Sequence, residues 1–136
     1  MAGETNLSTL IANMEPELSP IAFVFVTVDD LSTLNLSKVH GFYREKEGIT
    51  LILEKTVADN LGLSYDFVAS CITLRIHSSL EAVGLTAAFS NTLAKQGISC
   101  NVVAAYYHDH IFVDTINATK AMDALVEMTN QNNTAL

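Results

Sequence analysis

The sequence predicts an α+β fold made of two similar units. Along most of the chain, hydrophobic residues alternate between the period of a strand and the period of a helix. A length of 136 residues fits one ordinary domain, or two very small ones that share a core. Because no low-complexity linker interrupts the pattern, we expect two closely packed halves, residues 1–64 and 65–132.

The first half begins with a helix and a buried strand. Apolar residues at i, i+3, i+4 and i+7 predict a short amphipathic helix over Leu7–Met14. Pro16 and Pro20 should end this helix and separate it from the next element. The nearly continuous apolar run Ile21–Val28 is typical of a strand that is buried on both faces.

A hairpin should follow the polar loop at residues 29–37. The segments Val39–Arg44 and Ile49–Glu54 predict two strands, joined by a turn that contains Gly48. After the hairpin, Thr56 and Asp59 resemble a capping box, which marks the start of a helix. Glycine is favoured just beyond a helix C-terminus, so a helix of fewer than two turns should end near residue 62.

The second half opens with a strand, a loop and a helix. Apolar and more polar residues alternate over Ile72–His77, which predicts a strand with one buried face. An apolar stripe over Leu85–Leu93 predicts an amphipathic helix, and Gly97 should end it. The loop between them contains Gly84 and can offer free backbone N–H groups to a ligand.

Two more strands and a helix should close the chain. The segments Ile98–Ala104 and His110–Asp114 predict strands around a bend at Tyr107–Asp109. A helix capped by Asn117 should run to about Met128. The order β-α-β-β-α is the start of the split βαβ arrangement called ferredoxin-like. The first half has the order α-β-β-β-α, which we interpret as a degenerate version that lacks its opening strand.

Composition limits the possible partners. The net charge is −8, and the seven Lys and Arg residues are scattered, which argues against binding to nucleic acid or to anionic membranes. Hydrophobic residues make up 49% of the chain and charged residues only 16%, so we expect a partner to cover some apolar surface. The simplest such partner is a second copy, which would make a homodimer.

The chain lacks the features of a secreted, membrane or cofactor-dependent protein. Its N-terminus has no basic segment followed by a long apolar core, and no apolar run is long enough to span a bilayer. Cys71 and Cys100 lie in strand patterns and are expected to be reduced and buried, so we predict a cytoplasmic protein. With no phosphate-binding glycine fingerprint, we predict no cofactor.

Three segments together resemble a known family. They are GETNLSTLI, GFYREKEGITLIL and ITLRIHSSLEAVGLTAAFSNTLAKQGISCNVVAAYYHDHIFVD. From Gly3 to about Met128 the chain resembles small bacterial proteins built from two ACT-type domains, and the arginine-sensing relatives of the aspartate kinase regulatory region. The resemblance implies two ferredoxin-like units that bind amino acids or other small effectors where domains pair. Ala105 departs from a pattern in which glycine often precedes the paired tyrosines, and its methyl group would narrow any pocket beneath the strand.

The loop from His77 to Leu85 is the main candidate site. Its serines and the backbone near Gly84 can donate to a carboxylate at the helix N-terminus, and Glu81 can bind an amino group. The alternative is that the serines cap the helix and that Gly84 only allows close packing. The candidate ligand-binding residues are Ser78, Ser79, Glu81, Gly84 and Leu85, with Asn101 and Val102 from the adjacent strand.

Catalytic and metal-binding alternatives are weaker. His108 and His110 could share a metal ion, but His77 and Asp114 would have to complete the site, and a bend between the two histidines would separate them. Hydrogen-bonded turn histidines are the alternative. We therefore predict no metal site and no catalytic residue. The residue types indicate a regulatory protein that senses a small effector and is not an enzyme. A small histidine-dependent enzyme and a ligand-free interaction module are the rival interpretations.

Overall fold

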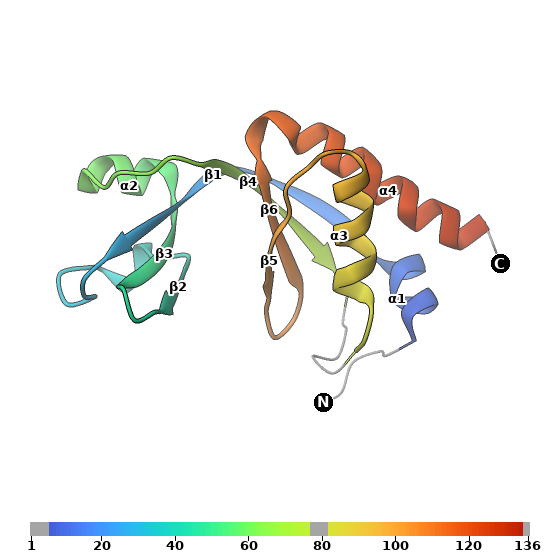
Figure 1. Cartoon of the computed structure of the whole chain (residues 1–136), viewed down its shortest axis with the longest axis horizontal. Coiled ribbons are helices and arrows are strands. Elements are labelled where there is room, and N and C mark those ends of the chain that lie inside the picture. The colour runs from blue at the N-terminus through green and yellow to red at the C-terminus, as the bar shows by residue number, and fades with distance from the viewer. Residues whose placement is uncertain (1–5, 77–81, 135–136) are drawn as a thin grey trace. The chain divides into compact units, whose positions relative to one another are not determined.

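The computed structural model describes residues 6–76 and 82–134, and it confirms the predicted α+β fold (Figure 1). The chain forms two compact units that are nested in sequence. Unit one combines Met1–Ser19 with Ser70–Leu136, and unit two is Pro20–Ala69. The division of the sequence into two domains between residues 64 and 65 stays a prediction.

Unit one places helices on one face of its strands, as Figure 1 shows. Its strands follow the order β1-β4-β6-β5, with β1 contributing its N-terminal part. Its elements are α1 (Leu7–Asn13), β1 (Glu15–Val28), β4 (Val68–Arg75), α3 (Leu85–Lys95), β5 (Asn101–Ala104), β6 (Asp109–Asp114), the 3₁₀ turn η2 (Thr115–Asn117) and α4 (Ala118–Thr134).

The core of unit one follows the predicted periodicities. On α3, the buried residues Leu85, Phe89 and Leu93 recur every four positions. On β4, Ile72 and Leu74 are fully buried, as alternation requires. These side chains pack in one cluster with residues of α1, β6 and α4, so the helices are held to the strands mainly by apolar burial.

Unit two is a smaller antiparallel unit with the strand order β2-β3-β1. Its own core contains Val24, Val26, Leu51, Leu53 and Ala58. Besides the C-terminal part of β1, its elements are the 3₁₀ turn η1 (Leu36–Lys38), β2 (Gly41–Arg44), β3 (Ile49–Glu54) and α2 (Lys55–Leu61).

Unit two has its opening strand but only a remnant of its first helix. Its order β1-η1-β2-β3-α2 matches β4-α3-β5-β6-α4 of unit one, with η1 in the place of α3. This differs from the expectation of a missing strand. The reason is local: Asp30 Oδ1 accepts from Ser32 N at 2.9 Å, and Asn35 Oδ1 accepts from Ser37 N at 3.1 Å. The Asp30 bond competes with helical hydrogen bonds, and the Asn35 bond caps only the three-residue η1.

The start of β1 differs from the sequence prediction. The strand begins at Glu15 and contains both Pro16 and Pro20, whereas the sequence predicted a start at Ile21. Pairing of β1 with β3 begins only at Phe23, so the prolines lie where no β3 residue pairs with the strand. A proline lacks a ladder donor and is tolerated at such an edge.

Helix ends agree with the sequence in part. Gly62 and Gly97 follow α2 and α3 with φ of 68° and 72°, as predicted. The capping box at Thr56 is wrong, because α2 begins at Lys55 and Thr56 lies inside it. Asn117 lies in η2, where the Asp114 side chain accepts from Ile116 N at 3.1 Å, and α4 continues past Met128 to Thr134.

Candidate functional site

The loop with the main candidate site is described from residue 82 onward. Ser78, Ser79 and Glu81 lie outside the described residues, so their roles stay predictions. Gly84 directly precedes α3 with φ 99° and ψ −16°, and its carbonyl accepts from Ala88 N at 2.9 Å. Among the described residues, no side chain caps the first turn of α3. The first N–H groups of α3 therefore have no side-chain partner within residues 6–76 and 82–134.

Gly84 also has a packing role. A Cβ atom at this position would lie 3.1 Å from Leu7 Cδ2 of α1, closer than most real contacts. The positive φ adds a backbone reason for glycine, since side chains with a Cβ rarely adopt it. Close packing, one of the two interpretations of Gly84, is therefore supported by the geometry, and it is compatible with backbone donation to a ligand.

The other described candidates have little free polar chemistry. Leu85 is buried in the core of unit one, and Val102 is half-buried against the same cluster. The Asn101 side chain is used within the hairpin, where Nδ2 donates to Phe112 O at 3.2 Å. The register pairs these two residues directly, which explains the bond. The structure thus brings Asn101 and Val102 to β5, and Gly84 and Leu85 to the start of α3.

The two histidines have separate partners. His108 Nδ1 lies 3.3 Å from the carbonyl oxygen of Ile76, so this nitrogen donates. His110 Nδ1 lies 2.9 Å from Thr73 Oγ1. Within residues 6–76 and 82–134, no three His, Cys, Asp or Glu side chains are grouped closely enough to hold a metal ion. A metal site completed by His77 is not tested by this structure, because His77 lies outside the described residues.

Asp109 lies between the histidines and is nearly buried. Burial raises the pKa of its carboxyl group, although the neighbouring His110 and His108 act in the opposite direction. Both cysteines are unbridged, as predicted, with Cys71 buried and Cys100 half-buried. Burial raises the pKa of both thiols, which keeps them protonated and argues against a nucleophile.

Tyr106 and Tyr107 form an exposed aromatic pair. Their rings meet edge to face with centroids 5.0 Å apart, and 64% and 68% of the two residues are exposed. They lie in the turn between β5 and β6, which closes through a bond from Ala105 N to His108 O at 3.1 Å. Val103 on β5 is also exposed, so this end of unit one presents apolar surface.

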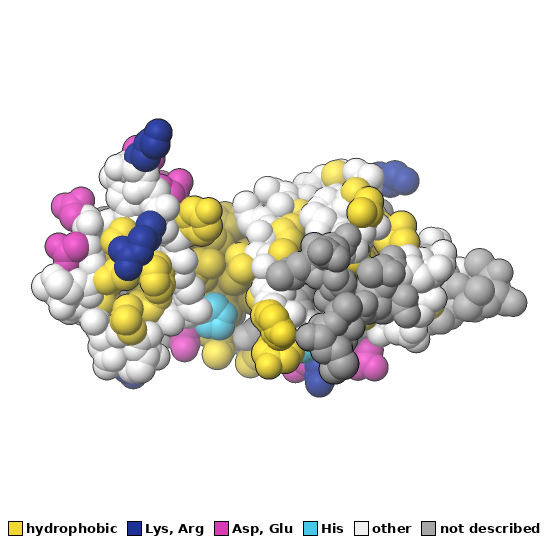
Figure 2. All heavy atoms as spheres, turned by 90° about the horizontal axis from the view of Figure 1, so that it is seen from below, with side chains coloured by type: hydrophobic (Ala, Val, Ile, Leu, Met, Phe, Trp, Pro, Cys, Tyr) yellow, Lys and Arg dark blue, Asp and Glu magenta, His cyan; other side chains and the backbone are white. Residues whose placement is uncertain are grey.

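A second apolar surface lies on the edge strand β2 of unit two. Phe42 and Tyr43 are exposed there, and the Arg44 guanidinium carbon lies 5.5 Å above the centre of the Phe42 ring. Figure 2 shows hydrophobic side chains gathered on a face of this unit, with a basic side chain across them. The sequence did not single out this patch.

A hollow of about 300 Å³ opens beside α2 in unit two. Its walls come from the segment 33–39, from β3 and from α2. The apolar residues that form it looked like ordinary core positions in the sequence. The shortness of η1, which exposes the hollow, could have been suspected from the Asp, Ser and Asn residues of the polar loop.

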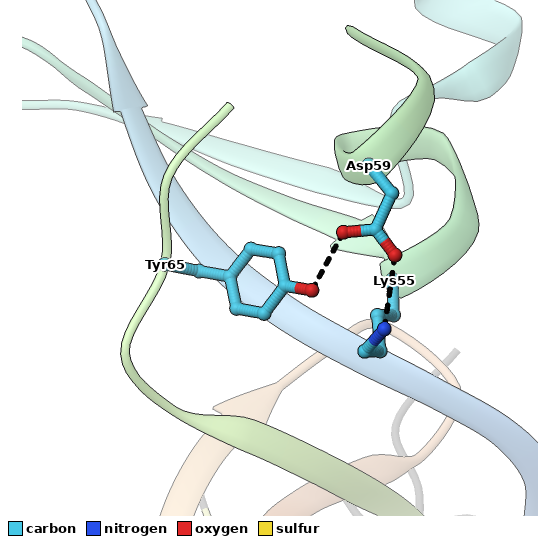
Figure 3. Close-up of polar contacts among 3 residues, drawn as sticks. All are labelled: Lys55, Asp59 and Tyr65. Carbon is cyan, nitrogen blue, oxygen red and sulfur yellow. Dashed lines mark hydrogen bonds and ion pairs between the residues drawn. The ribbon is translucent and has the colours of Figure 1, made fainter. Parts of the chain in front are cut away.

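A polar network holds α2 to the segment that follows it (Figure 3). Asp59 accepts from Lys55 Nζ at 2.9 Å and from Tyr65 OH at 2.6 Å. The hydrogen bonds from Tyr65 and Lys55 lower the pKa of Asp59, and Asp59 in turn raises the pKa of Lys55. Asp59 therefore acts here as an anchor of the helix, in place of the capping role expected of it.

Family models and solved structures were compared with the chain. One ACT-domain model matches residues 2–70, and a second matches residues 67–127. A Vibrio cholerae protein of unknown function, described as a possible transport protein, is 48% identical over 90% of this chain and 95% of its own, with a TM-score of 0.82. No functionally curated protein matched.

More distant structures share the fold. The ligand-free regulatory subunit of aspartate kinase from Thermus thermophilus is 8% identical, with a TM-score of 0.61 over 85% of this chain and 96% of its own. Aspartate kinase from Clostridium acetobutylicum is 11% identical, with a TM-score of 0.63, and matches over 85% of this chain and 34% of its own.

None of the helices in the described ranges is long and apolar enough to cross a membrane.

These matches confirm the two ferredoxin-like units and the resemblance seen in the sequence. The two family matches follow one another along the chain and together extend from residue 2 to residue 127. By these two matches, which cover most of its length, the chain belongs to the ACT-domain family.

Proposed function

We propose that this protein is a regulatory protein that binds a small-molecule effector, with an amino acid as the first candidate, and that it is not an enzyme. The observation that carries the proposal is the tandem pair of ACT domains along nearly the whole chain. Similar folds occur in proteins named as regulatory subunits of aspartate kinase, which supports a regulatory role.

The effector site is proposed at the loop that leads into α3. Within the described residues no side chain caps the start of this 11-residue helix, and N–H groups at a helix N-terminus favour a carboxylate, because the helix dipole and the donors act together. Ser78 and Ser79 would add hydroxyl donors, and Glu81 would bind the effector's amino group. Leu85 would contribute only its backbone, since its side chain is buried. Asn101 and Val102 would contact the effector from β5.

Effector binding would act by shifting an equilibrium between two arrangements of subunits. A ligand shifts such an equilibrium only by the difference in its affinity for the two states. The signal would then reach a separate partner, or would be expressed as a change in the oligomer itself. A cytoplasmic location and the absence of nucleic-acid partners stay predictions from the charge and composition.

A thermal-shift screen of the common amino acids tests this function. An effector present at a hundred times its dissociation constant should add about 2.7 kcal/mol to the free energy of unfolding, which is several degrees in Tm. Glu81→Gln should abolish the shift, whereas Glu127→Gln, a matched change at an exposed site on α4, should keep it. If no amino acid raises Tm, the amino-acid version of the proposal fails.

We also propose that the protein forms a homodimer through the exposed end of unit one. β5 is the last strand in its sheet order, and Val103, Tyr106 and Tyr107 expose apolar surface beside it. Tyrosines are common anchors at interfaces because they bury a large area with few rotatable bonds.

Removing both tyrosines should therefore weaken self-association. The Tyr106→Ser/Tyr107→Ser double variant should raise the dimer dissociation constant at least about thirtyfold, as loss of a 2 kcal/mol interface anchor would. Sedimentation equilibrium measures this directly against the monomer mass of 14.7 kDa. Tyr43→Ser, at an even more exposed tyrosine on β2, is the control. A wild-type protein that is still monomeric at about 100 μM would contradict the proposal.

A further inference from the structure

The hollow in unit two combines an apolar wall with a polar rim. Its wall is formed by Leu34, Val39, Val57 and Leu61, and its rim carries Lys38 and Asn60. The first three wall residues are half-buried, and Leu61 is 52% exposed. Most small-molecule sites share this plan, in which apolar side chains supply contact area and a few polar groups fix orientation.

The hollow exists because η1 replaces a full helix. In unit one, the 11-residue helix α3 covers the corresponding position, whereas η1 has three residues. The side chains of Asp30 and Asn35 bond to the backbone near Ser32 and Ser37, which holds this segment in turns. One side of α2 is therefore left without a helical neighbour.

Three residues of α2 line the hollow from one face of the helix. Val57, Asn60 and Leu61 share a helix face by their spacing of three and four residues. Lys55 and Asp59 lie on another face and are engaged with Tyr65, as Figure 3 shows. The hydrogen bond from Tyr65 joins that face of α2 to the following segment, and the Asp59 carboxylate is engaged there.

The rim favours an anion. Within the described part of the chain, the side chains of Lys38 and Asn60 form no hydrogen bond and no ion pair. Lys38 therefore places an ammonium group that no described carboxylate pairs with at the mouth of the apolar hollow. The Asp30 carboxylate, which belongs to the same connecting segment, already accepts from the backbone and the hydroxyl of Ser32.

We propose that this hollow is a second ligand site, which binds a small organic acid with a short aliphatic tail. The tail lies against Val39, Val57 and Leu61, the carboxylate pairs with Lys38, and the Asn60 amide donates to it. A volume of about 300 Å³ is at the lower end for small-molecule sites and suits a tail of about five carbons. The site does not depend on the effector loop before α3, so either site can exist without the other.

Titration of the full-length ¹⁵N-labelled protein with 4-methylpentanoate tests this site. Amide signals of residues 34–39 and 57–61 should shift and saturate, with a dissociation constant on the order of 1 mM for so small a ligand. The uncharged 4-methylpentanamide should bind at least about fivefold more weakly, and acetate should cause no saturating shift, because each lacks one half of the recognised chemistry.

Matched variants separate the proposed contacts from general charge effects. Lys38→Gln should weaken binding of the acid about fivefold or more and leave binding of the amide unchanged. Lys46→Gln, an exposed lysine at the hairpin tip, should change neither. Leu61→Ser should weaken both ligands, because it removes apolar wall area.

Four results would overturn the second site. Three of them are a lack of saturation at tenfold the expected dissociation constant, an equal effect of the Lys38 and Lys46 variants, and shifts of the hollow signals on dilution of the protein, which would assign the hollow to a second copy. Shifts confined to residues 82–102 would also overturn it, while leaving the effector site of the proposed function intact. Failure of the amino-acid screen, in turn, leaves the result of this titration unaffected.

Discussion

Replacing Phe89 by alanine should lower the free energy of unfolding by about 3–5 kcal/mol. Phe89 is fully buried and is among the largest side chains in the core of unit one, where it packs with Leu85 and Leu93 of its own helix and with residues of β4, β6 and α4. Its removal loses apolar burial and leaves a cavity that the surrounding elements can only partly fill. Urea unfolding followed by circular dichroism measures the loss.

A matched change on the exposed side of the same helix serves as the control. Asn91→Ala alters an exposed position of α3 and should change stability by no more than about 0.5 kcal/mol. Because the free energy of unfolding of a small domain is only about 5–15 kcal/mol, the Phe89 variant should unfold at a clearly lower urea concentration than the wild type. A loss below about 1 kcal/mol would mean that α3 does not pack as described.

Replacing Gly84 by alanine should cost about 1–3 kcal/mol through backbone strain, with an added cost from steric contact. The φ of 99° is rarely adopted by residues with a Cβ, and the new methyl group would lie 3.1 Å from Leu7 Cδ2. The first effect acts on the backbone at the start of α3. The second pushes against α1. The same urea experiment measures the sum.

Gly97→Ala provides a comparison in which the steric contact is absent. Gly97 also has a positive φ, of 72°, but a Cβ there would meet no atom within 4 Å. Its substitution should therefore cost only the strain, about 1 kcal/mol. A double-mutant cycle with Leu7→Ala should show that the steric part of the Gly84 effect depends on Leu7. A cycle that shows no coupling between positions 84 and 7 would exclude a steric role for Leu7.

The proposed effector site was only partly accessible to sequence reasoning. The position of Gly84 before a helix followed from local pattern, since one glycine precedes an apolar stripe of helical period. The closeness of Gly84 to Leu7 did not follow from local pattern, because the two residues are far apart in sequence and meet only when α1 packs against α3. The bond from Asn101 to Phe112 O likewise depends on the register of a hairpin that no single strand specifies.

The hollow in unit two was hidden for the same reason. Val57 and Leu61 looked like ordinary inward-facing positions of a short helix, and Lys38 like one more scattered lysine. Their juxtaposition arises because η1 is too short to cover α2 and because Val57 and Leu61 share the face of α2 opposite to the one that bonds Tyr65. The start of β1 was misjudged similarly: whether Pro16 and Pro20 can lie in a strand depends on which neighbours pair with it.

Local chemistry alone was enough to predict the α+β class, most element types, the glycines beyond α2 and α3, and the buried faces of β4 and α3. These features depend on φ preference and on periods of two and 3.6 residues, which act between near neighbours in sequence. Only the tertiary structure decided that unit two is inserted within unit one, that its first helix is reduced to η1, and that a hollow is left beside α2. Each of these depends on contacts between distant segments, whose free energy exists only in the packed chain.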